Sequence, residues 1–300
     1  MTVRDYLVPR SLAEAVGLLE QHGPELLVMA GGTVAMPLVN EGISLPERVM
    51  SLRHAGLDEI TVADGMLRVG ATATLTRLAA VDAVPLLSEA ARRTASWPVR
   101  NMATVGGNLF TPPPGGDVAV ALLALDAQVR LGGPRGERSL PLAGFFTGFM
   151  TTALAADELL IAIEIPTAPR DTAYLKLGRR QGSTPAVVTV AVALARQAGR
   201  VESARIALGA AGPHPIRAAA AEAELLGASL ERRTIERVAE VAAAECRPFT
   251  DAIATEWYRR RMVRVFVRRA LEQIAGSGTE PGGPGPGTLD RSPAGDGWRG

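Results

Sequence analysis

In the stretch Leu26-Leu27-Val28-Met29-Ala30-Gly31-Gly32-Thr33, four large apolar residues and an alanine precede a pair of glycines and a hydroxyl side chain. The apolar run predicts a buried strand over residues 26–30, and residues 34–40 are expected to begin a helix after the loop. Glycine tolerates positive φ and lets backbone N–H groups approach an anion closely. A helix N-terminus adds a favourable dipole. This stretch therefore predicts a strand, a loop and a helix, with a phosphate site at the loop.

A second glycine pair has the same shape. Thr104-Val105-Gly106-Gly107-Asn108 follows the apolar residues Met102-Ala103 and again sets short polar side chains beside two residues without Cβ. A single Gly-Gly most often marks a tight turn. Two similar loops indicate a diphosphate site, because each offers backbone and side-chain donors.

Composition excludes several classes of function. The 300 residues are 47% hydrophobic, which is enough for more than one core. The 32 basic and 31 acidic residues leave a net charge of +1, and aromatics make up only 4%, so neither a polyanion-binding field nor a base-stacking platform is indicated. We expect no nucleic-acid partner and no membrane span. The N-terminal residues lack a basic-then-apolar signal, so we expect a cytoplasmic protein.

Metal and disulfide chemistry find little support. Cys246 is the only cysteine, which excludes an internal disulfide and an all-cysteine iron–sulfur or zinc site from this chain alone. The histidines His22, His54 and His214 are scattered and lie near Gly or Pro. We therefore predict no metal site and no catalytic residues, and any redox carrier must be organic.

The order of elements predicts two folded parts and a tail. Ser11-Leu12-Ala13-Glu14 is typical of a capping box that opens a helix, and Asp64-Gly65 indicates a hairpin between 59–62 and 66–71. The sequence then predicts helices over 74–80, 85–94 and 118–127, with strands over 129–131, 138–140 and 159–166. After residue 171 it predicts strands over 174–177, 186–195 and 205–209, and helices over 217–226, 231–245 and 255–274. Residues 276–300 are rich in Gly, Pro and Ser and are expected to be disordered.

Together these motifs resemble one protein family. Ala30-Gly31-Gly32-Thr33, Arg100 to Asn108, Asp157 to Pro166 and Tyr174-Leu175-Lys176-Leu177 are similar to the FAD-binding, or medium, subunits of molybdenum hydroxylases. This is the xanthine dehydrogenase and carbon monoxide dehydrogenase group, and the resemblance spans about residues 1–275. It implies an α+β fold: a two-subdomain FAD-binding domain of the vanillyl-alcohol-oxidase type, followed by a small C-terminal domain of antiparallel sheet and helices. The implied boundaries are 1–168, with subdomains of about 1–55 and 56–168, then 171–275.

The resemblance also implies the residues that bind FAD. The two glycine loops would hold the diphosphate, and Asp117 would accept hydrogen bonds from ribose or ribityl hydroxyls. From the residues alone, Asp117 is equally suited to be the N-cap of the following helix. Leu160 would pack on the flavin, and Lys176 would lie near the isoalloxazine as a stabilising cation. The full set is Met29, Ala30, Gly31, Gly32, Thr33, Val34, Ala35, Thr104, Gly106, Gly107, Asn108, Asp117, Leu160 and Lys176.

As a function, the resemblance implies an electron-transfer subunit of an oxidoreductase. A molybdopterin-containing large subunit would oxidise the substrate, and a 2Fe-2S small subunit would pass electrons to FAD on this chain and then to a terminal acceptor. Two alternatives stay open: a self-sufficient FAD-dependent oxidoreductase of the same fold, and a non-catalytic nucleotide-binding module. The substrate and the terminal acceptor, whether NAD, a quinone or oxygen, do not follow from the sequence.

Overall fold

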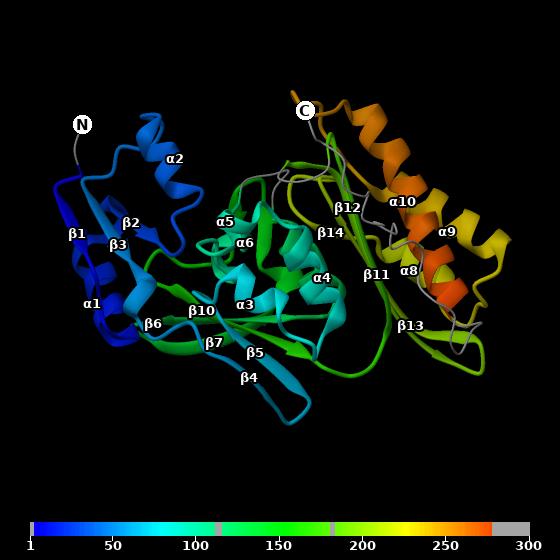
Figure 1. The fold of residues 1–300 in the computed structure, drawn as a ribbon, viewed down its shortest axis with the longest axis horizontal. Helices are drawn as coiled ribbons and strands as arrows, with labels where there is room; N and C mark the ends of the chain where they lie inside the picture. Colours follow the sequence, from blue (N-terminus) through cyan, green and yellow to red (C-terminus); the bar gives the residue numbers. More distant parts are fainter. Residues whose placement is uncertain (1–2, 112–115, 181–183, 278–300) are drawn as a thin grey trace, which may run out of the picture.

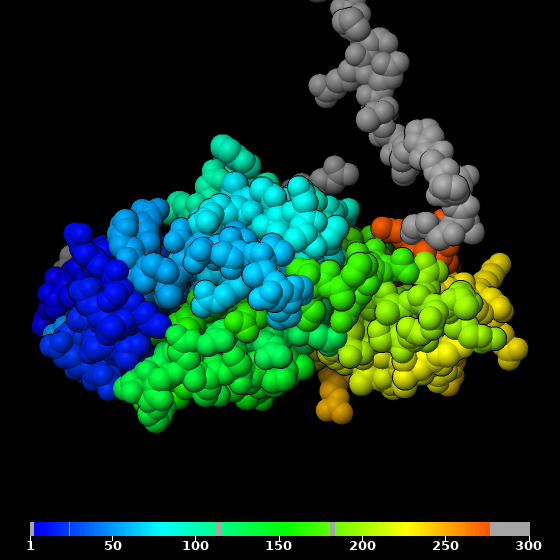
Figure 2. Space-filling model, turned by 90° about the horizontal axis from the view of Figure 1, so that it is seen from below, coloured from blue at the N-terminus to red at the C-terminus, as the bar shows by residue number. Residues whose placement is uncertain are grey.

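The computed structural model describes residues 3–111, 116–180 and 184–277. Its parts follow one another along the long axis of the molecule, with the N-terminal part at one end and the C-terminal helices at the other (Figures 1 and 2). Residues 278–300 of the predicted disordered tail lie outside the described residues. Gly276 and Ser277 do not belong to a tail, because the last helix continues through them.

The N-terminal part is a small parallel sheet with one long helix. Strands β1 (Asp5–Leu7), β3 (Arg48–Ser51) and β2 (Leu26–Met29) pair in parallel in that order. Helix α1 (Leu12–His22) begins where Ser11 accepts a hydrogen bond from the Glu14 N–H, as the capping motif predicted. Helix α2 (Ala35–Asn40) follows the first glycine loop. The strand, loop and helix predicted around Gly31 are therefore confirmed, whereas β1 and β3 are too short to have been predicted from periodicity.

The central part is a five-stranded antiparallel sheet in the order β4-β5-β10-β6-β7. Its strands are β4 (Ile60–Ala63), β5 (Met66–Gly70), β10 (Leu159–Pro166), β6 (Gln128–Gly133) and β7 (Gly136–Pro141). The helices of this part are α3 (Leu75–Ala79), α4 (Pro85–Arg93), α5 (Trp97–Arg100), α6 (Val105–Leu109) and α7 (Asp117–Ala124). Strands β8 (Phe146–Gly148) and β9 (Thr151–Thr152) pair as a two-stranded ribbon.

Three short 3-10 turns among the described residues complete these two parts. Two lie in the N-terminal part, at Gly23–Glu25 and Leu52–His54, and the third lies in the central part, at Leu142–Gly144.

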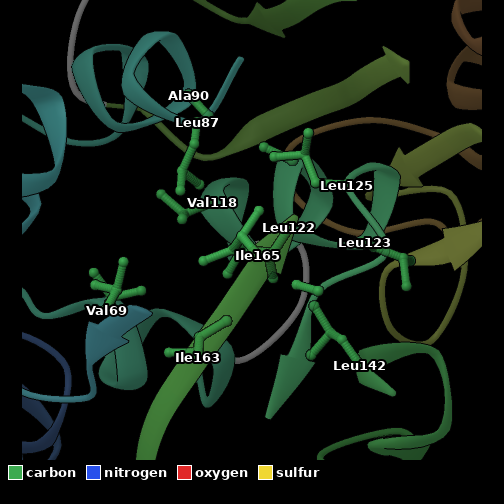
Figure 3. Packing of buried hydrophobic residues seen from close by; sticks show 14 of the residues in the cluster. Val69, Leu87, Ala90, Val118, Leu122, Leu123, Leu125, Leu142, Ile163 and Ile165 are labelled. Carbon is green, nitrogen blue, oxygen red and sulfur yellow. The ribbon is translucent and has the colours of Figure 1, made fainter. Parts of the chain in front are cut away.

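Helix α7 lies at the centre of the molecule. Every residue from Asp117 to Ala124 is buried, which fits the uninterrupted apolar run that predicted a core helix. Its side chains meet those of α4, β5 and β10 in one hydrophobic cluster (Figure 3). Because such a helix has no solvent face, its position is fixed on all sides.

The C-terminal part is a four-stranded antiparallel sheet in the order β11-β12-β13-β14. Its strands are β11 (Asp171–Gly178), β12 (Ala186–Gln197), β13 (Arg200–Gly209) and β14 (Ile216–Arg217). Helices α8 (Ala219–Leu225), α9 (Arg232–Glu245) and α10 (Glu256–Ser277) cover one face of this sheet (Figure 1). The predicted strands and helices are thus confirmed, although β11 and β13 begin earlier than the sequence indicated.

The opposite face of the C-terminal sheet packs on α7. Tyr174, Ala191, Ala193 and Ala207 belong to the same hydrophobic cluster as α7. The alternation along β12 sends Val188, Val190, Val192 and Leu194 to the helix-covered face instead. The central and C-terminal parts therefore share a packed core.

An ionic cluster fixes the far end of α7 to the same sheet. Asp126, just after the helix, accepts hydrogen bonds from Arg205 at 2.6 Å, Arg217 at 3.1 Å and Arg170 at 3.2 Å. Burial opposes ionisation of Asp126, but the hydrogen bond and charge of Arg205 and the charge of Arg217 lower its pKa overall. Cations from the C-terminal part thus hold the C-terminal end of a helix from the central part.

None of the helices among residues 3–111, 116–180 and 184–277 combines the length and apolarity needed to cross a membrane.

Candidate functional site

A cavity of about 740 Å³ opens where the three parts of the molecule meet. This volume lies in the range of cofactor pockets. All the residues predicted for the cofactor site line it, from Met29 to Ala35, from Thr104 to Asn108 with the exception of Val105, and at Asp117, Leu160 and Lys176. The structure therefore brings together side chains that are far apart in the chain.

The first glycine loop presents its backbone to the cavity. Gly32 has φ +71°, the left-handed conformation that favours glycine. The N–H groups of residues 31–35 donate no hydrogen bond to any of the described residues. Consecutive N–H groups without an internal partner, ahead of the first turn of α2, form the kind of concavity that binds an anion.

The two glycine loops touch each other at one point. A Cβ built on Gly31 would lie 2.1 Å from the main-chain oxygen of Met102, well inside any real contact distance. Glycine at position 31 is therefore required so that the first loop can lie against the chain that leads into the second.

The second glycine loop differs from the first, and the expectation that both present their N–H groups in the same way is wrong. It forms the first turns of α6, without positive φ. The N–H groups of Val105 and Gly106 donate to Ala73 and Ala71, each at 2.9 Å, and that of Gly107 donates to Thr104 Oγ1 at 3.1 Å. Its glycines instead allow close packing, because a Cβ on Gly106 would lie 2.8 Å from the Ala71 oxygen.

Asn108 acts on helix α7. Its Oδ1 accepts hydrogen bonds from the N–H groups of Val118 at 3.0 Å and Ala119 at 3.2 Å. These N–H groups belong to the first turn of α7 and would otherwise lack partners. The N-cap residue itself is Gly116, with φ +79°. The alternative that Asp117 is the N-cap is therefore wrong, since Asp117 is the first residue of the helix.

The Asp117 carboxylate is held by two side chains of the C-terminal sheet. Lys176 Nζ donates to Asp117 Oδ2 at 2.6 Å, and the Thr189 hydroxyl donates to Oδ1 at 3.0 Å. The side chains of Lys176 and Asp117 are 8% and 10% exposed, so this ion pair is buried in the cavity wall. Tyr174 adds a contact of 3.4 Å from its hydroxyl to the main-chain oxygen of Asp117, and burial raises the pKa of that phenol, which keeps it protonated.

Sequence reasoning missed many residues in and beside the cavity wall, and three of them are polar side chains that bear on its chemistry. Thr189 was predicted only as part of an apolar strand. The one signal for a role is that a polar residue occupies a buried position of β12. Thr72 lines the cavity, and its buried hydroxyl has no hydrogen-bond partner among the described residues. Glu158 was noted only as part of a strand motif, yet it also lines the cavity.

Glu158 is a buried carboxylate paired with an arginine. Arg138 donates to both of its oxygens at 2.7 Å, and the Ala155 N–H donates to Oε2 at 2.9 Å. The hydrogen bond from Arg138 is the main cause that lowers the pKa of Glu158 from 4.5 to about 2. The carboxylate is therefore ionised at neutral pH.

The paired Glu158 should make stability depend on pH in acid. Because its folded pKa is depressed, its contribution is complete above pH 4.5 and is lost as the pH falls toward about 2. We expect Glu158→Gln to remove on the order of 1 kcal/mol of stability at neutral pH and to shrink the acid-induced loss in that window. Urea unfolding followed at several pH values tests this. Identical pH profiles for the wild type and the variant would contradict it.

No group of three or more His, Cys, Asp or Glu side chains that could hold a metal occurs within the described part of the chain. The cavity instead combines free backbone donors, an unpartnered hydroxyl and a buried cation with apolar walls. A dinucleotide with an anionic diphosphate and a flat ring system fits such a donor set.

Comparisons with known proteins assign the two halves of the chain. Residues 2–168 match the family described as FAD binding domain in molybdopterin dehydrogenase, and residues 173–274 match the CO dehydrogenase flavoprotein C-terminal domain. The carbon monoxide dehydrogenase medium chain of Hydrogenophaga pseudoflava is 32% identical over 274 residues, covering 89% of this chain and 95% of that protein. The xanthine dehydrogenase FAD-binding subunit of Escherichia coli O157:H7 is 30% identical over 279 residues, with coverage of 89% and 95%.

Solved structures agree with these matches. Carbon monoxide dehydrogenase from Hydrogenophaga pseudoflava superimposes with a TM-score of 0.88 at 33% identity, covering 92% of this chain and 98% of that one. Quinoline 2-oxidoreductase from Pseudomonas putida 86 gives a TM-score of 0.87 at 29% identity, with coverage of 93% and 99%. With its cavity, its α+β architecture and both family matches, the chain belongs to the FAD-binding subunits of the molybdenum hydroxylases, the group that includes the medium chains of carbon monoxide dehydrogenase and the FAD-binding subunits of xanthine dehydrogenase.

Proposed function

We propose that this chain holds one FAD along the cavity, with the diphosphate at the first glycine loop and the flavin ring between Leu160 and Lys176. The observation that carries this proposal is the row of N–H groups at residues 31–35, which have no acceptor among the described residues and lie at the N-terminal end of α2. The second loop would support the first and contribute the Thr104 hydroxyl and the Asn108 amide N–H groups as donors. FAD supplies two-electron redox chemistry, and the protein binds, orients and shields it.

The remaining residues would set the environment of the ring. Leu160 gives an apolar surface, and Lys176 brings a buried positive charge that favours negative charge gained by the ring on reduction. Because Asp117 already accepts from Lys176 and Thr189, only its remaining lone pairs are available to a ribityl or ribose hydroxyl. Val34 and Ala35 would contribute backbone contacts alone.

We further propose a molybdopterin-containing large subunit and a 2Fe-2S small subunit as partners. Relatives named as medium chains or FAD-binding subunits of multi-subunit dehydrogenases support this. So does the single buried cysteine, which leaves cluster ligation to another chain. NAD, a quinone and oxygen all remain candidates for the terminal acceptor.

The proposed domain division is 1–168 and 171–275, with subdomains of about 1–55 and 56–168 in the first. The ends of the two family matches, at residues 168 and 173, support it. The core shared by α7 and the C-terminal sheet implies that these domains do not move freely against each other. The cytoplasmic location stays a prediction from the sequence.

The proposed role predicts dependence on partners. The purified chain with FAD should show no reduction of its flavin by an organic substrate, and reduction should follow when the molybdenum and iron–sulfur subunits are added. The visible absorbance of oxidised flavin, followed anaerobically with and without partners, measures this. Substrate oxidation by the chain alone at the rate of the full assembly would instead establish a self-sufficient flavoenzyme.

The same preparation tests how the cofactor is held. Among the described residues that line the cavity there is no His or Cys to form a covalent flavin bond, so acid precipitation should release all flavin into the supernatant. Flavin that stays on the precipitated chain would contradict noncovalent binding. Correctly folded chain that binds no flavin would overturn the proposed function.

A further inference from the structure

A row of three residues crosses the C-terminal sheet opposite the start of α7. Lys176 on β11 is the register partner of Thr189 on β12, and Thr189 is the partner of Gly209 on β13. Direct cross-strand partners carry their side chains on the same face. Lys176 and Thr189 therefore reach the Asp117 carboxylate together, one to each oxygen.

Gly209 makes this approach possible. A Cβ at that position would lie 2.6 Å from Cγ2 of Val120 in α7 and 3.2 Å from Cβ of Thr189. The next row on the same face carries the small residues Ala191 and Ala207, beside Tyr174 on β11. The small residues on this face of the sheet therefore allow α7 to pack close to it, so that Asp117 contacts Thr189.

Thr189 does not belong to the cavity wall. It is 1% exposed, and its hydroxyl donates to Asp117 Oδ1. Its two neighbours in the network, Asp117 and Lys176, both line the cavity. The Thr189 hydroxyl also lies within hydrogen-bond reach of the buried Tyr174 hydroxyl, but of these two partners only Asp117 lines the cavity, so an effect on a bound cofactor passes through Asp117.

We infer that Thr189 is a positioning residue for the flavin: by fixing one oxygen of Asp117 it sets where the other oxygen holds the Lys176 ammonium on the cavity wall. The ammonium has three donors, and Asp117 Oδ2 at 2.6 Å and Arg93 O at 3.4 Å account for two. The third is available to a ligand. Without the hydrogen bond from Thr189, the Asp117 carboxylate could rotate together with the Lys176 side chain. The third N–H of Lys176 would then no longer point in a fixed direction.

This inference rests on the proposed function, because the ligand in question is FAD. It assigns part of the FAD site to β12, a strand of the C-terminal sheet none of whose residues lines the cavity. A purely structural role for Thr189, as a buried residue of β12, makes a different prediction, since loss of packing would not depend on the charge of Asp117.

The experiment is a titration of the purified full chain with FAD, followed by flavin fluorescence. Thr189→Val keeps the shape and removes the donor, and we expect it to raise the dissociation constant about tenfold, as for loss of one hydrogen bond to a charged group. Thr189→Ser restores the hydroxyl and should bind within about twofold of wild type. Thr172→Val on β11 removes a hydroxyl remote from Asp117 and should leave the affinity unchanged.

A double-mutant cycle separates positioning from structure. In an Asp117→Ala background, Thr189→Val should have little further effect on FAD affinity, because alanine leaves no oxygen to accept the hydrogen bond of the Thr189 hydroxyl. Equal losses in both backgrounds would overturn the inference. So would unchanged affinity in the single valine variant when the wild type binds FAD. A wild-type chain that binds no FAD would instead overturn the proposed function.

If the valine variant does not fold, Thr189→Ala and Thr189→Ser give the same comparison. Loss of FAD affinity in the alanine variant alone supports the inference, and equal affinity in the two variants overturns it.

Discussion

Replacing Gly31 by alanine is expected to weaken FAD binding by about a hundredfold. The added Cβ would lie 2.1 Å from the Met102 oxygen and 2.9 Å from its carbonyl carbon, and both are backbone atoms that cannot rotate away. The first loop must therefore shift, and its free N–H groups shift with it. Overpacking of this kind costs up to about 3 kcal/mol. Fluorescence titration with FAD measures the loss.

Gly17→Ala is the matched control. Gly17 lies within α1, is exposed, and would meet nothing within 4 Å of a new Cβ. Alanine there should leave FAD affinity unchanged and stabilise the chain by up to about 1 kcal/mol, because alanine favours a helix. Wild-type affinity in the Gly31 variant would show that the first loop does not form the diphosphate site.

The second large effect is expected from Lys176→Met. The substitution leaves the Asp117 carboxylate buried with only Thr189 as a side-chain donor. Breaking a buried ion pair from one side costs about 3–5 kcal/mol, because the remaining charge stays desolvated. Urea unfolding of the flavin-free chain should show this loss.

Two further variants identify the cause. Adding Asp117→Asn to Lys176→Met removes the stranded charge and should recover much of the stability. Arg135→Ala breaks the exposed pair with Asp157, whose side chains are 69% and 33% exposed, and should cost at most about 1 kcal/mol. If Lys176→Met were no more destabilising than Arg135→Ala, the pair at Asp117 would not be buried in solution.

Local sequence was sufficient for most of the elements. The capping motif at Ser11, the hairpin at Asp64-Gly65 and the alternation over 159–166 each depend on neighbours a few residues away, and the structure has α1, the β4–β5 hairpin and β10 there. The short strands β1 and β3 escaped prediction because three or four residues carry too little periodicity. They become strands only by pairing with each other and with β2.

The two glycine loops show what local sequence could not predict. Two stretches of similar composition differ in backbone state: the N–H groups of residues 31–35 lack acceptors among the described residues, whereas those of Val105 and Gly106 donate to Ala73 and Ala71. Residue type determined that both positions need glycine. Which N–H groups are already paired depends on the strand end that packs against them, and no property of the loop itself contains that information.

The sequence by itself determined the apolar runs, the caps and fourteen of the residues that line the cavity, because these follow from local pattern and from residue types matched to a family. Only the tertiary structure decided how those residues are paired. Asp117 meets Lys176 across a sequence separation of 59 and Thr189 across 72. The physical reason is packing: α7 is buried on every side, and Gly209 lets it lie so close to the C-terminal sheet that its first carboxylate can be satisfied only by that sheet.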